Sequence, residues 1–420
     1  MLKKIIYALL SFIIACTPKI NQQEATILEN KTTTMHENQI DSLANRYLDV
    51  GRFSGTIVVS ENGAVVFNKS YGLADYSNVK NFTDSTAFKI GHLSELFTKA
   101  IVEDLISKNK IKAEEQIKNY IPQIEKEFTV EELLNHTSGL QTISQIQEAN
   151  ENMPYSTLEY VALSNSENQN VASELDYNIL GLLIEKVTEK SFDEVLEDYA
   201  QKWNLESTYF HKTDTTHLAI GYLFFNYGNQ GLKLSPAPKY QNSTAFSSRG
   251  IKSTALDILK FTKQFPNKNF DTEGYLMNDG FSYSLKKDDS KDRTVLILSN
   301  RKHPVAREMS ESIEKILDEE EYELPLPRRE IAIDVNLLKE YEGTYSLNEN
   351  MSLTFVAEKD SLFFLMGENK IRLIPQSENQ FFMLESDAST RFERDENGKV
   401  TKAILMDGFL EGNTIMKVME

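Results

Sequence analysis

The sequence predicts an α/β protein, of the α+β kind, in which an antiparallel sheet flanked by helices precedes a separate all-β domain. Three observations predict it. Two β-rich runs around the turn Asn62-Gly63 indicate a hairpin. Helical periodicity then dominates up to about residue 264. Beyond an acidic and proline-containing break at residues 318–329, short alternating segments repeat at close spacing, as in a small barrel or sandwich.

Composition fits this organisation. At 420 residues the chain is too long for one ordinary domain. Hydrophobic residues make up 40% and charged residues 26%, which is typical of globular proteins and argues against extended disorder. The formal net charge is -18, without a basic block. A surface of that sign repels phosphate backbones, so nucleic acid is not expected as a partner.

The N-terminus predicts export and lipidation. Lys3 and Lys4 precede the apolar run 5–14, and a small residue precedes Cys16, the only cysteine of the chain. This run resembles a bacterial lipobox, in which the cysteine is lipidated and becomes the mature N-terminus. We therefore expect a signal peptide over 1–16, a flexible tether over 17–35, and a lipid anchor to the cell membrane or outer membrane, with the protein facing the periplasm or the surface. A plain signal peptide with an incidental cysteine is the alternative.

Residues 36–318 are expected to form the α/β body, with a first amphipathic helix from His36 to Asp49. Strands are expected over 53–59, 64–67, 281–285 and 293–299. Further helices are expected over 94–108, 129–135, 177–188, 252–264 and 310–318, with Ser253 as the N-cap of the helix over 252–264. Residues 319–332 form the expected linker, and 333–420 the C-terminal β domain.

Several stretches, in order, resemble the β-lactamase-related serine hydrolase family, which includes class C β-lactamases, D,D-peptidases and esterases. The most informative stretches are Phe53-Ser54-Gly55-Thr56-Ile57-Val58-Val59, Tyr71-Gly72-Leu73-Ala74-Asp75, Phe88-Lys89-Ile90-Gly91, Leu133-Leu134-Asn135-His136-Thr137-Ser138-Gly139-Leu140, Tyr177-Asn178-Ile179-Leu180-Gly181 and Val295-Leu296-Ile297-Leu298-Ser299-Asn300. The resemblance covers about residues 36–318 and implies the serine β-lactamase-like fold. Tyr341-Glu342-Gly343-Thr344-Tyr345 is similar to the β-rich domain that often follows it.

The family's chemistry needs a serine at a helix N-terminus and a lysine one turn later that takes up its proton. In the family the serine follows Phe-x-Ile-Gly and the lysine comes three residues after it. Here the resemblance places His92 at the nucleophile position and Glu95 at the lysine position. Ser94 lies two residues on, about 200° around a helix, and is expected to point away from the pocket.

Two further elements depart from the family pattern. Counting back from Tyr177 places the Tyr-Ser-Asn-like motif on Ala172, Ser173 and Glu174, where only the serine survives. No His/Lys-Thr-Gly precedes Gly280, although Asp271-Thr272-Glu273-Gly274 stands nearby without the cation. The turn His136-Thr137-Ser138-Gly139 is interpreted as structural, with Gly139 reversing the backbone. We therefore expect no intact catalytic residues at these positions.

The sequence predicts a pseudo-enzyme that binds a peptidoglycan fragment, a peptide or a protein partner at the cell envelope. Whether the chain is an enzyme stays open at this point. The alternatives are an active serine hydrolase, esterase or peptidase, with a rearranged site, and a structural envelope lipoprotein. No cofactor is expected. A metal site at His92, Glu95 and Glu174 is a further alternative, although Glu95 in a first helical turn also complements the helix dipole.

Overall fold

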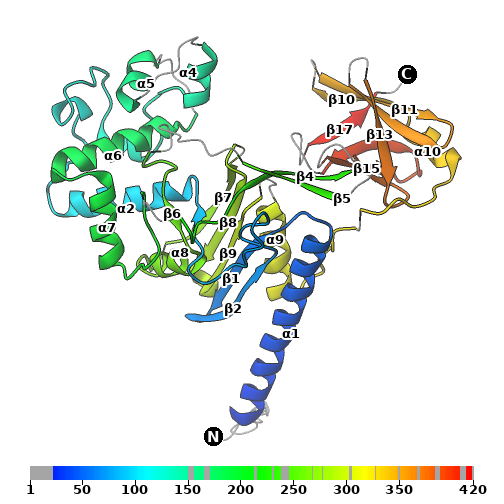
Figure 1. Ribbon diagram of the computed structural model, residues 1–420, viewed down its shortest axis with the longest axis horizontal. Coiled ribbons are helices and arrows are strands. Elements are labelled where there is room, and N and C mark those ends of the chain that lie inside the picture. The colour runs from blue at the N-terminus through cyan, green and yellow to red at the C-terminus, as the bar shows by residue number, and fades with distance from the viewer. Residues whose placement is uncertain are drawn as a thin grey trace, which may run out of the picture.

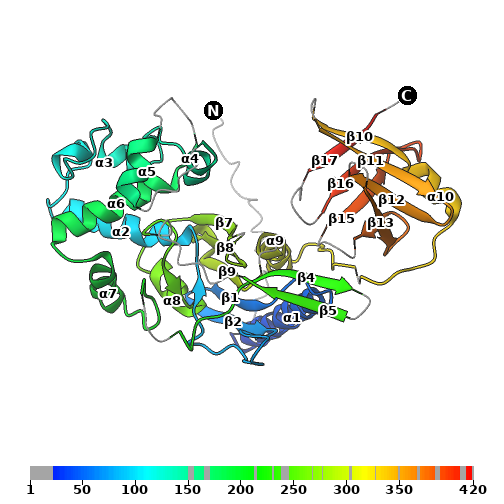
Figure 2. The same cartoon turned by 45° about the horizontal axis from the view of Figure 1, so that its top comes forward.

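The computed structural model describes residues 22–149, 156–164, 171–211, 215–228, 231–237, 246–266, 268–276, 278–301, 305–326, 328–348, 351–366, 369–383, 388–406 and 413–418. Cys16 and the expected signal peptide lie outside these residues. Figures 1 and 2 show an α/β body and, set apart from it, a C-terminal β-barrel. Within the described residues, no helix combines the length and the apolar character needed to cross a membrane.

The central sheet of the body is antiparallel, with strand order β2-β1-β9-β8-β7. Its strands, and the short pairs β3–β6 and β4–β5 of the body, have these bounds: β1 Gly55–Glu61, β2 Ala64–Tyr71, β3 Phe88–Lys89, β4 Tyr222–Gly228, β5 Gly231–Pro236, β6 Lys252–Ser253, β7 Phe270–Leu276, β8 Phe281–Asp288 and β9 Arg293–Ser299.

Helices cover both faces of this sheet, with α1 and α9 on one face and α8 on the other (Figure 2). The helices of the body, with two 3-10 turns, are α1 Gln22–Asp49, α2 Leu93–Ser107, η1 Ile117–Asn119, α3 Val130–Leu134, α4 Ile143–Ala149, α5 Thr157–Leu163, α6 Glu174–Thr188, α7 Phe192–Lys202, α8 Ala255–Thr262, η2 Asp289–Lys291 and α9 Val305–Leu317.

The two faces of the sheet belong to two cores because side chains alternate along a strand. Ile57 and Val59 pack with α1 and α9, whereas Val58 between them faces the other core, which the sheet shares with the helical lobe that contains α2 and α6. β9 is buried along its whole length in the same way. The continuous apolar runs in the sequence therefore reflect central strands covered on both sides.

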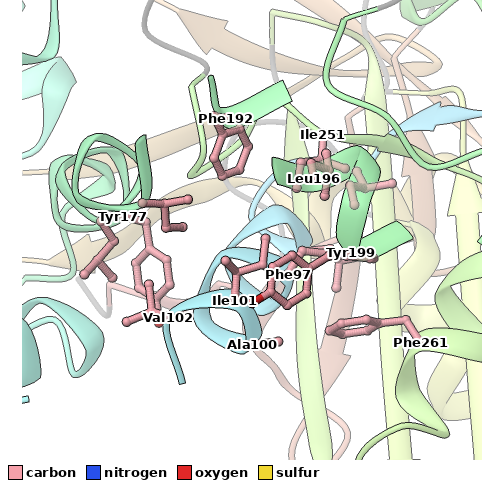
Figure 3. Close-up of a cluster of buried hydrophobic side chains, with 14 of the residues drawn as sticks. Phe97, Ala100, Ile101, Val102, Tyr177, Phe192, Leu196, Tyr199, Ile251 and Phe261 are labelled. Carbon is pink, nitrogen blue, oxygen red and sulfur yellow. The ribbon is translucent and has the colours of Figure 1, made fainter. Parts of the chain in front are cut away.

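The core on the lobe side is organised around α2. Figure 3 shows Phe97 of α2 beside Phe261 of α8, and the two rings stack with centroids 4.1 Å apart. Tyr177 of α6 lies on the other side of α2, near Val102 (Figure 3). This packing fixes α2 and α6 relative to each other, and the N-terminal ends of these two helices carry the positions singled out in the sequence.

Two local expectations were wrong. Residues 22–35, expected within the tether, continue α1 back to Gln22. The tether was predicted because the segment is polar. However, the segment contains neither glycine nor proline, and its Gln, Glu, Ala, Leu and Lys residues have good helix propensity. The N-cap of α8 is Thr254, whose side chain accepts a hydrogen bond from Asp257 N at 3.1 Å. Ser253 instead ends β6 and bonds to Thr208.

The C-terminal unit is a closed barrel of strands β10 to β17 preceded by the short helix α10. Its elements are α10 Val335–Tyr341, β10 Gly343–Asn348, β11 Met351–Glu358, β12 Ser361–Met366, β13 Asn369–Pro375, β14 Gln380–Phe382, β15 Ser389–Arg394, β16 Val400–Leu405 and β17 Thr414–Lys417. Aromatic side chains fill the barrel, with Phe392 stacked on Tyr341 at 4.5 Å between centroids. The expected all-β domain is therefore a barrel and not a sandwich.

Candidate functional site

The start of α2 is held in place by backbone pairing and by a tight turn. β3 pairs with β6, and the chain then turns at Gly91, whose φ of +55° suits glycine. A Cβ atom on Gly91 would lie 2.8 Å from Leu276 Cδ1, so β7 approaches the turn closely. His92 follows as the N-cap residue of α2. The backbone at the position of the family's nucleophile is thus held rigidly between α2 and the edge strand β7.

Ser94 is not available at this site. Its side chain is fully buried, and its hydroxyl accepts a hydrogen bond from the backbone N–H of Ile251 at 3.1 Å. This contact ties the first turn of α2 to the strand that precedes α8. The serine therefore has a structural role.

Glu95 lies between two histidines. Its Oε1 is 3.0 Å from His92 Nδ1, and its Oε2 is 3.3 Å from His136 Nε2. Burial alone would raise the pKa of this carboxyl, but the hydrogen bonds from His136 and His92 outweigh it and hold the pKa below the usual value. Glu95 is therefore ionised at neutral pH, where the family has a lysine cation.

His136 continues the chain of contacts to α6. Its Nδ1 lies 3.0 Å from Asp176 Oδ2, and the Ser138 hydroxyl donates to the other oxygen of Asp176. Burial lowers the pKa of His136, but hydrogen bonds to Asp176 and Glu95 reverse this effect and raise it to about 9. Burial dominates at Asp176 and raises its pKa above the usual value. At neutral pH, His136 is therefore an imidazolium between two carboxylates.

The three positions of the Tyr-Ser-Asn-like motif lead into α6. Ala172 is exposed. Ser173 is buried and caps the helix: its hydroxyl accepts from Leu175 N at 3.2 Å and donates to Gln141 O at 2.7 Å. Glu174 is the first helical residue, and one of its oxygens lies 3.3 Å from Arg249 Nη1. The surviving serine therefore caps a helix.

Tyr283 of β8 occupies the space beside His92. Burial and the charge of Glu95 raise the pKa of its hydroxyl, and the nearby Thr272 side chain on β7 and the backbone of His92 oppose this effect in part. Gly274 leaves room for it, since a Cβ atom there would lie 2.7 Å from the Tyr283 hydroxyl. The segment 271–274, noted in the sequence, is thus the edge strand next to His92. Tyr283 is therefore packed against the backbone at the nucleophile position.

The structure gives no support to a metal site at His92, Glu95 and Glu174. The second carboxylate oxygen of Glu174 lies 3.3 Å from Ile143 N, so both oxygens are directed to other partners. Among the residues that the structure describes, no group of three or more His, Cys, Asp and Glu side chains could hold a metal ion.

Sequence reasoning brought His92 and Glu95 together but missed the residues around them. His136 was interpreted as part of a turn, and its φ of +54° agrees with that, yet its ring is also the centre of the site. Asp176 is an acidic residue at the start of a largely apolar helical run, and the structure buries it. An acidic residue in such a run is the signal that could have indicated a buried partner. Arg249 and Tyr283 carried no signal in the sequence.

Comparison with known proteins finds relatives and solved structures that share this fold. Penicillin-binding protein 4* of Bacillus subtilis is 20% identical over 89% of this chain and 98% of its own length. The octameric penicillin-binding protein homologue from Pyrococcus abyssi superposes with a TM-score of 0.57 at 18% identity, covering 90% of this chain and 99% of that one. A class C β-lactamase gives a TM-score of 0.55 at 17% identity over 68% of this chain and 98% of its own.

Family matches cover both units. Residues 327–414 match a domain of unknown function (DUF3471), which corresponds to the barrel. Residues 40–294, more than half of the chain, match the Beta-lactamase family. The chain therefore belongs to the Beta-lactamase family.

Proposed function

We propose that the protein is a pseudo-enzyme of its family with respect to serine chemistry, and that it binds a cell-envelope peptide ligand or a protein partner without forming an acyl-serine. One observation carries the proposal: the nucleophile and lysine positions hold His92 and Glu95, which are hydrogen-bonded to each other and linked through His136 to Asp176. This closed chain of polar contacts replaces the serine–lysine pair.

The serines close to the site support the same proposal. A nucleophilic serine needs a base within hydrogen-bond reach of its hydroxyl. Ser94 accepts from a backbone amide in the core, and Ser173 caps α6. Ser138 donates to Asp176, but His136 bonds to that carboxylate through Nδ1 and not to the hydroxyl, so the three do not form a serine–histidine–aspartate relay.

The environment for the developing oxyanion also differs. Acyl transfer is accelerated by backbone N–H donors directed at the developing negative charge. Here the Tyr283 side chain lies against the backbone of Gly91 and beside His92. Tyr283 is only 2% exposed, so a packed side chain fills the space next to the backbone at the nucleophile position. The ionised Glu95 nearby disfavours any oxyanion further.

Charge also argues against penicillin-like ligands. The family site gathers cations that suit carboxylate-bearing substrates, whereas this one holds Glu95 and Glu174. The Arg249 cation already pairs with Glu174, and His136 with Glu95 and Asp176. We expect penicillins to bind poorly.

The penicillin-binding relatives and the lipobox-like N-terminus support a place at the cell envelope, with Cys16 as the proposed anchor. Cys16→Ala should move the protein from the membrane fraction to the soluble fraction, and unchanged fractionation would contradict the anchor.

The test is intact-mass spectrometry of the full chain after treatment with a fluorophosphonate and, separately, with a penicillin. An active class C β-lactamase serves as the labelled control. We expect no covalent adduct on this protein with either reagent, and no micromolar affinity for the penicillin. Thermal stabilisation by muropeptides without turnover would support the binding role, because a ligand selective for the folded state raises its stability.

A stoichiometric adduct mapped to one serine would overturn the proposal and would identify an active serine hydrolase with a rearranged site. If neither reagent reacts and no muropeptide stabilises the protein, the pseudo-enzyme part stands. The ligand would then have to be sought among protein partners of the envelope.

A further inference from the structure

His92 combines an oriented imidazole with an open nitrogen. Its Nδ1 is fixed by Glu95 at 3.0 Å, while its side chain is 44% exposed. The Nε2 atom makes no hydrogen bond to any residue in the part of the chain that the structure describes. A carboxylate on one ring nitrogen and solvent on the other is the arrangement by which proteins prepare a histidine to take up a proton.

Glu95 determines the tautomer of this ring. An ionised carboxylate only accepts hydrogen bonds, so the hydrogen lies on Nδ1 and the lone pair of the neutral ring lies on Nε2. Glu95 cannot easily swing away, because His136 holds its second oxygen and only 15% of its side chain is exposed. The orientation of His92 is thus supported by a second layer of contacts.

The backbone around His92 is equally constrained. Gly91 packs against Leu276 and Tyr283, and Tyr283 lies beside the backbone of His92. His217 is the opposite case: it is also exposed, but its Nδ1 lies 3.2 Å from a serine hydroxyl, Ser85 Oγ, and not from a carboxylate. His92 and His217 therefore form a natural comparison between an oriented and a merely exposed imidazole.

We propose that His92 and Glu95 form a general-base dyad that hydrolyses small activated esters without any serine. Nε2 of His92 takes a proton from a water molecule while the water oxygen forms a bond to the ester carbonyl carbon. Glu95 stabilises the resulting imidazolium through Nδ1–H. The bond from carbon to the leaving oxygen then breaks, a phenolate departs, the product is a carboxylic acid, and the imidazolium returns its proton to solvent.

The inference rests on the proposed function in one respect: it assumes that no serine at this site forms an acyl-enzyme. It limits the substrates to esters whose leaving group departs readily. Tyr283 is packed beside the backbone of His92 and Glu95 is negative, so poor leaving groups would receive no help from oxyanion stabilisation. Amides and β-lactams are therefore outside the proposed activity.

The experiment measures hydrolysis of p-nitrophenyl acetate by the full chain, with and without prior fluorophosphonate treatment. His92→Ala is compared with the matched control His217→Gln, and each variant is checked for an unchanged melting temperature. Imidazole is then added to His92→Ala, because rescue by free imidazole reports a missing base and not a structural defect. Glu95→Gln tests the orienting carboxylate.

We expect turnover that resists fluorophosphonate, falls at least about tenfold in His92→Ala, recovers in part with imidazole and is unchanged in His217→Gln. Equal rates for the wild type and His92→Ala would overturn the dyad while leaving the proposed function intact. Turnover abolished by fluorophosphonate, with an adduct on a serine, would overturn both. The two failures are therefore distinguishable.

Discussion

Glu95 brings a negative charge into a mostly buried position, and the protonated His136 beside it offsets that charge. His136 also contacts Asp176, whose side chain is only 1% exposed. Two carboxylates this close would repel each other without a cation between them. The imidazolium of His136 therefore offsets the negative charge that Glu95 brings to the position where the family has a lysine.

This charge makes stability depend on pH. The pKa of His136 is raised from the ordinary histidine value of 6.5 to about 9 in the folded protein, so its contribution to stability is complete below pH 6.5 and is lost as the pH rises through 9. We predict that the free energy of unfolding falls between pH 6.5 and 9.5, by an amount on the order of 1–3 kcal/mol from this residue. Urea unfolding at both pH values measures it.

The matched comparison is His136→Gln, which keeps a polar side chain but cannot carry the proton. Subtracting the free energy of unfolding of the variant from that of the wild type cancels the contributions of other groups that titrate in this range. One such group is Lys252, whose pKa is lowered to about 8 by burial and by Lys89. The difference in stability between wild type and variant should shrink as the pH rises. A difference that stays constant from pH 6.5 to 9.5 would show that His136 does not carry the charge.

At the scale of elements, the N-terminus of α6 supports the site. Ser173 closes the helix and anchors it to the backbone of Gln141, one turn before Asp176. α6 also packs against α3, and His136 lies in the turn after α3, which places Asp176 within reach of His136. The serine that survives from the family motif is thus part of the support and does not take part in chemistry.

We predict that Ser173→Ala destabilises the body by about 2 kcal/mol, because the cap is lost and the Gln141 carbonyl loses the hydrogen bond from the buried Ser173 hydroxyl. Ser191→Ala is the control: Ser191 is the N-cap of α7 and accepts from the backbone N–H of Glu194, but it is exposed and holds no distant carbonyl, so about 1 kcal/mol is expected. Urea unfolding followed by fluorescence of Trp203, the only tryptophan, reports on the body. Equal losses in the two variants would contradict the anchoring role.

The elements most visible in the sequence were those with strong local patterns. The expected strand 293–299 coincides with β9, and the hairpin at Asn62-Gly63 joins β1 to β2. Contacts distant in sequence were not visible: Glu95 and His136 are 41 residues apart, and His136 and Asp176 are 40 apart. Nothing local marks such a pairing, because it depends on how α2, α6 and the turn after α3 pack together.

At the scale of the whole molecule, the body and the barrel have separate cores. The residues of the barrel core all lie between 338 and 415, and none of them belongs to either core of the body. Phe392 is at the centre of the barrel core, in ring contact with Tyr341, Tyr345, Phe355 and Phe381. Units with independent cores can unfold independently, so damage to one core should leave the other intact.

We predict that Phe392→Ala removes about 3–5 kcal/mol from the barrel alone, since an emptied ring position leaves a cavity. The thermal transition of the barrel should fall by more than about 10 °C, whereas the transition seen by Trp203 fluorescence should not move. Phe97→Ala is the reciprocal control, because Phe97 is fully buried in the body against Phe261 and Trp203. Calorimetry of the full chain resolves the two transitions, and a single transition that shifts equally in both variants would show that the two units unfold as one. If the transitions separate, ligand stabilisation can be assigned to one unit, and muropeptides that bind at the His92–Glu95 site should raise only the transition that Trp203 reports.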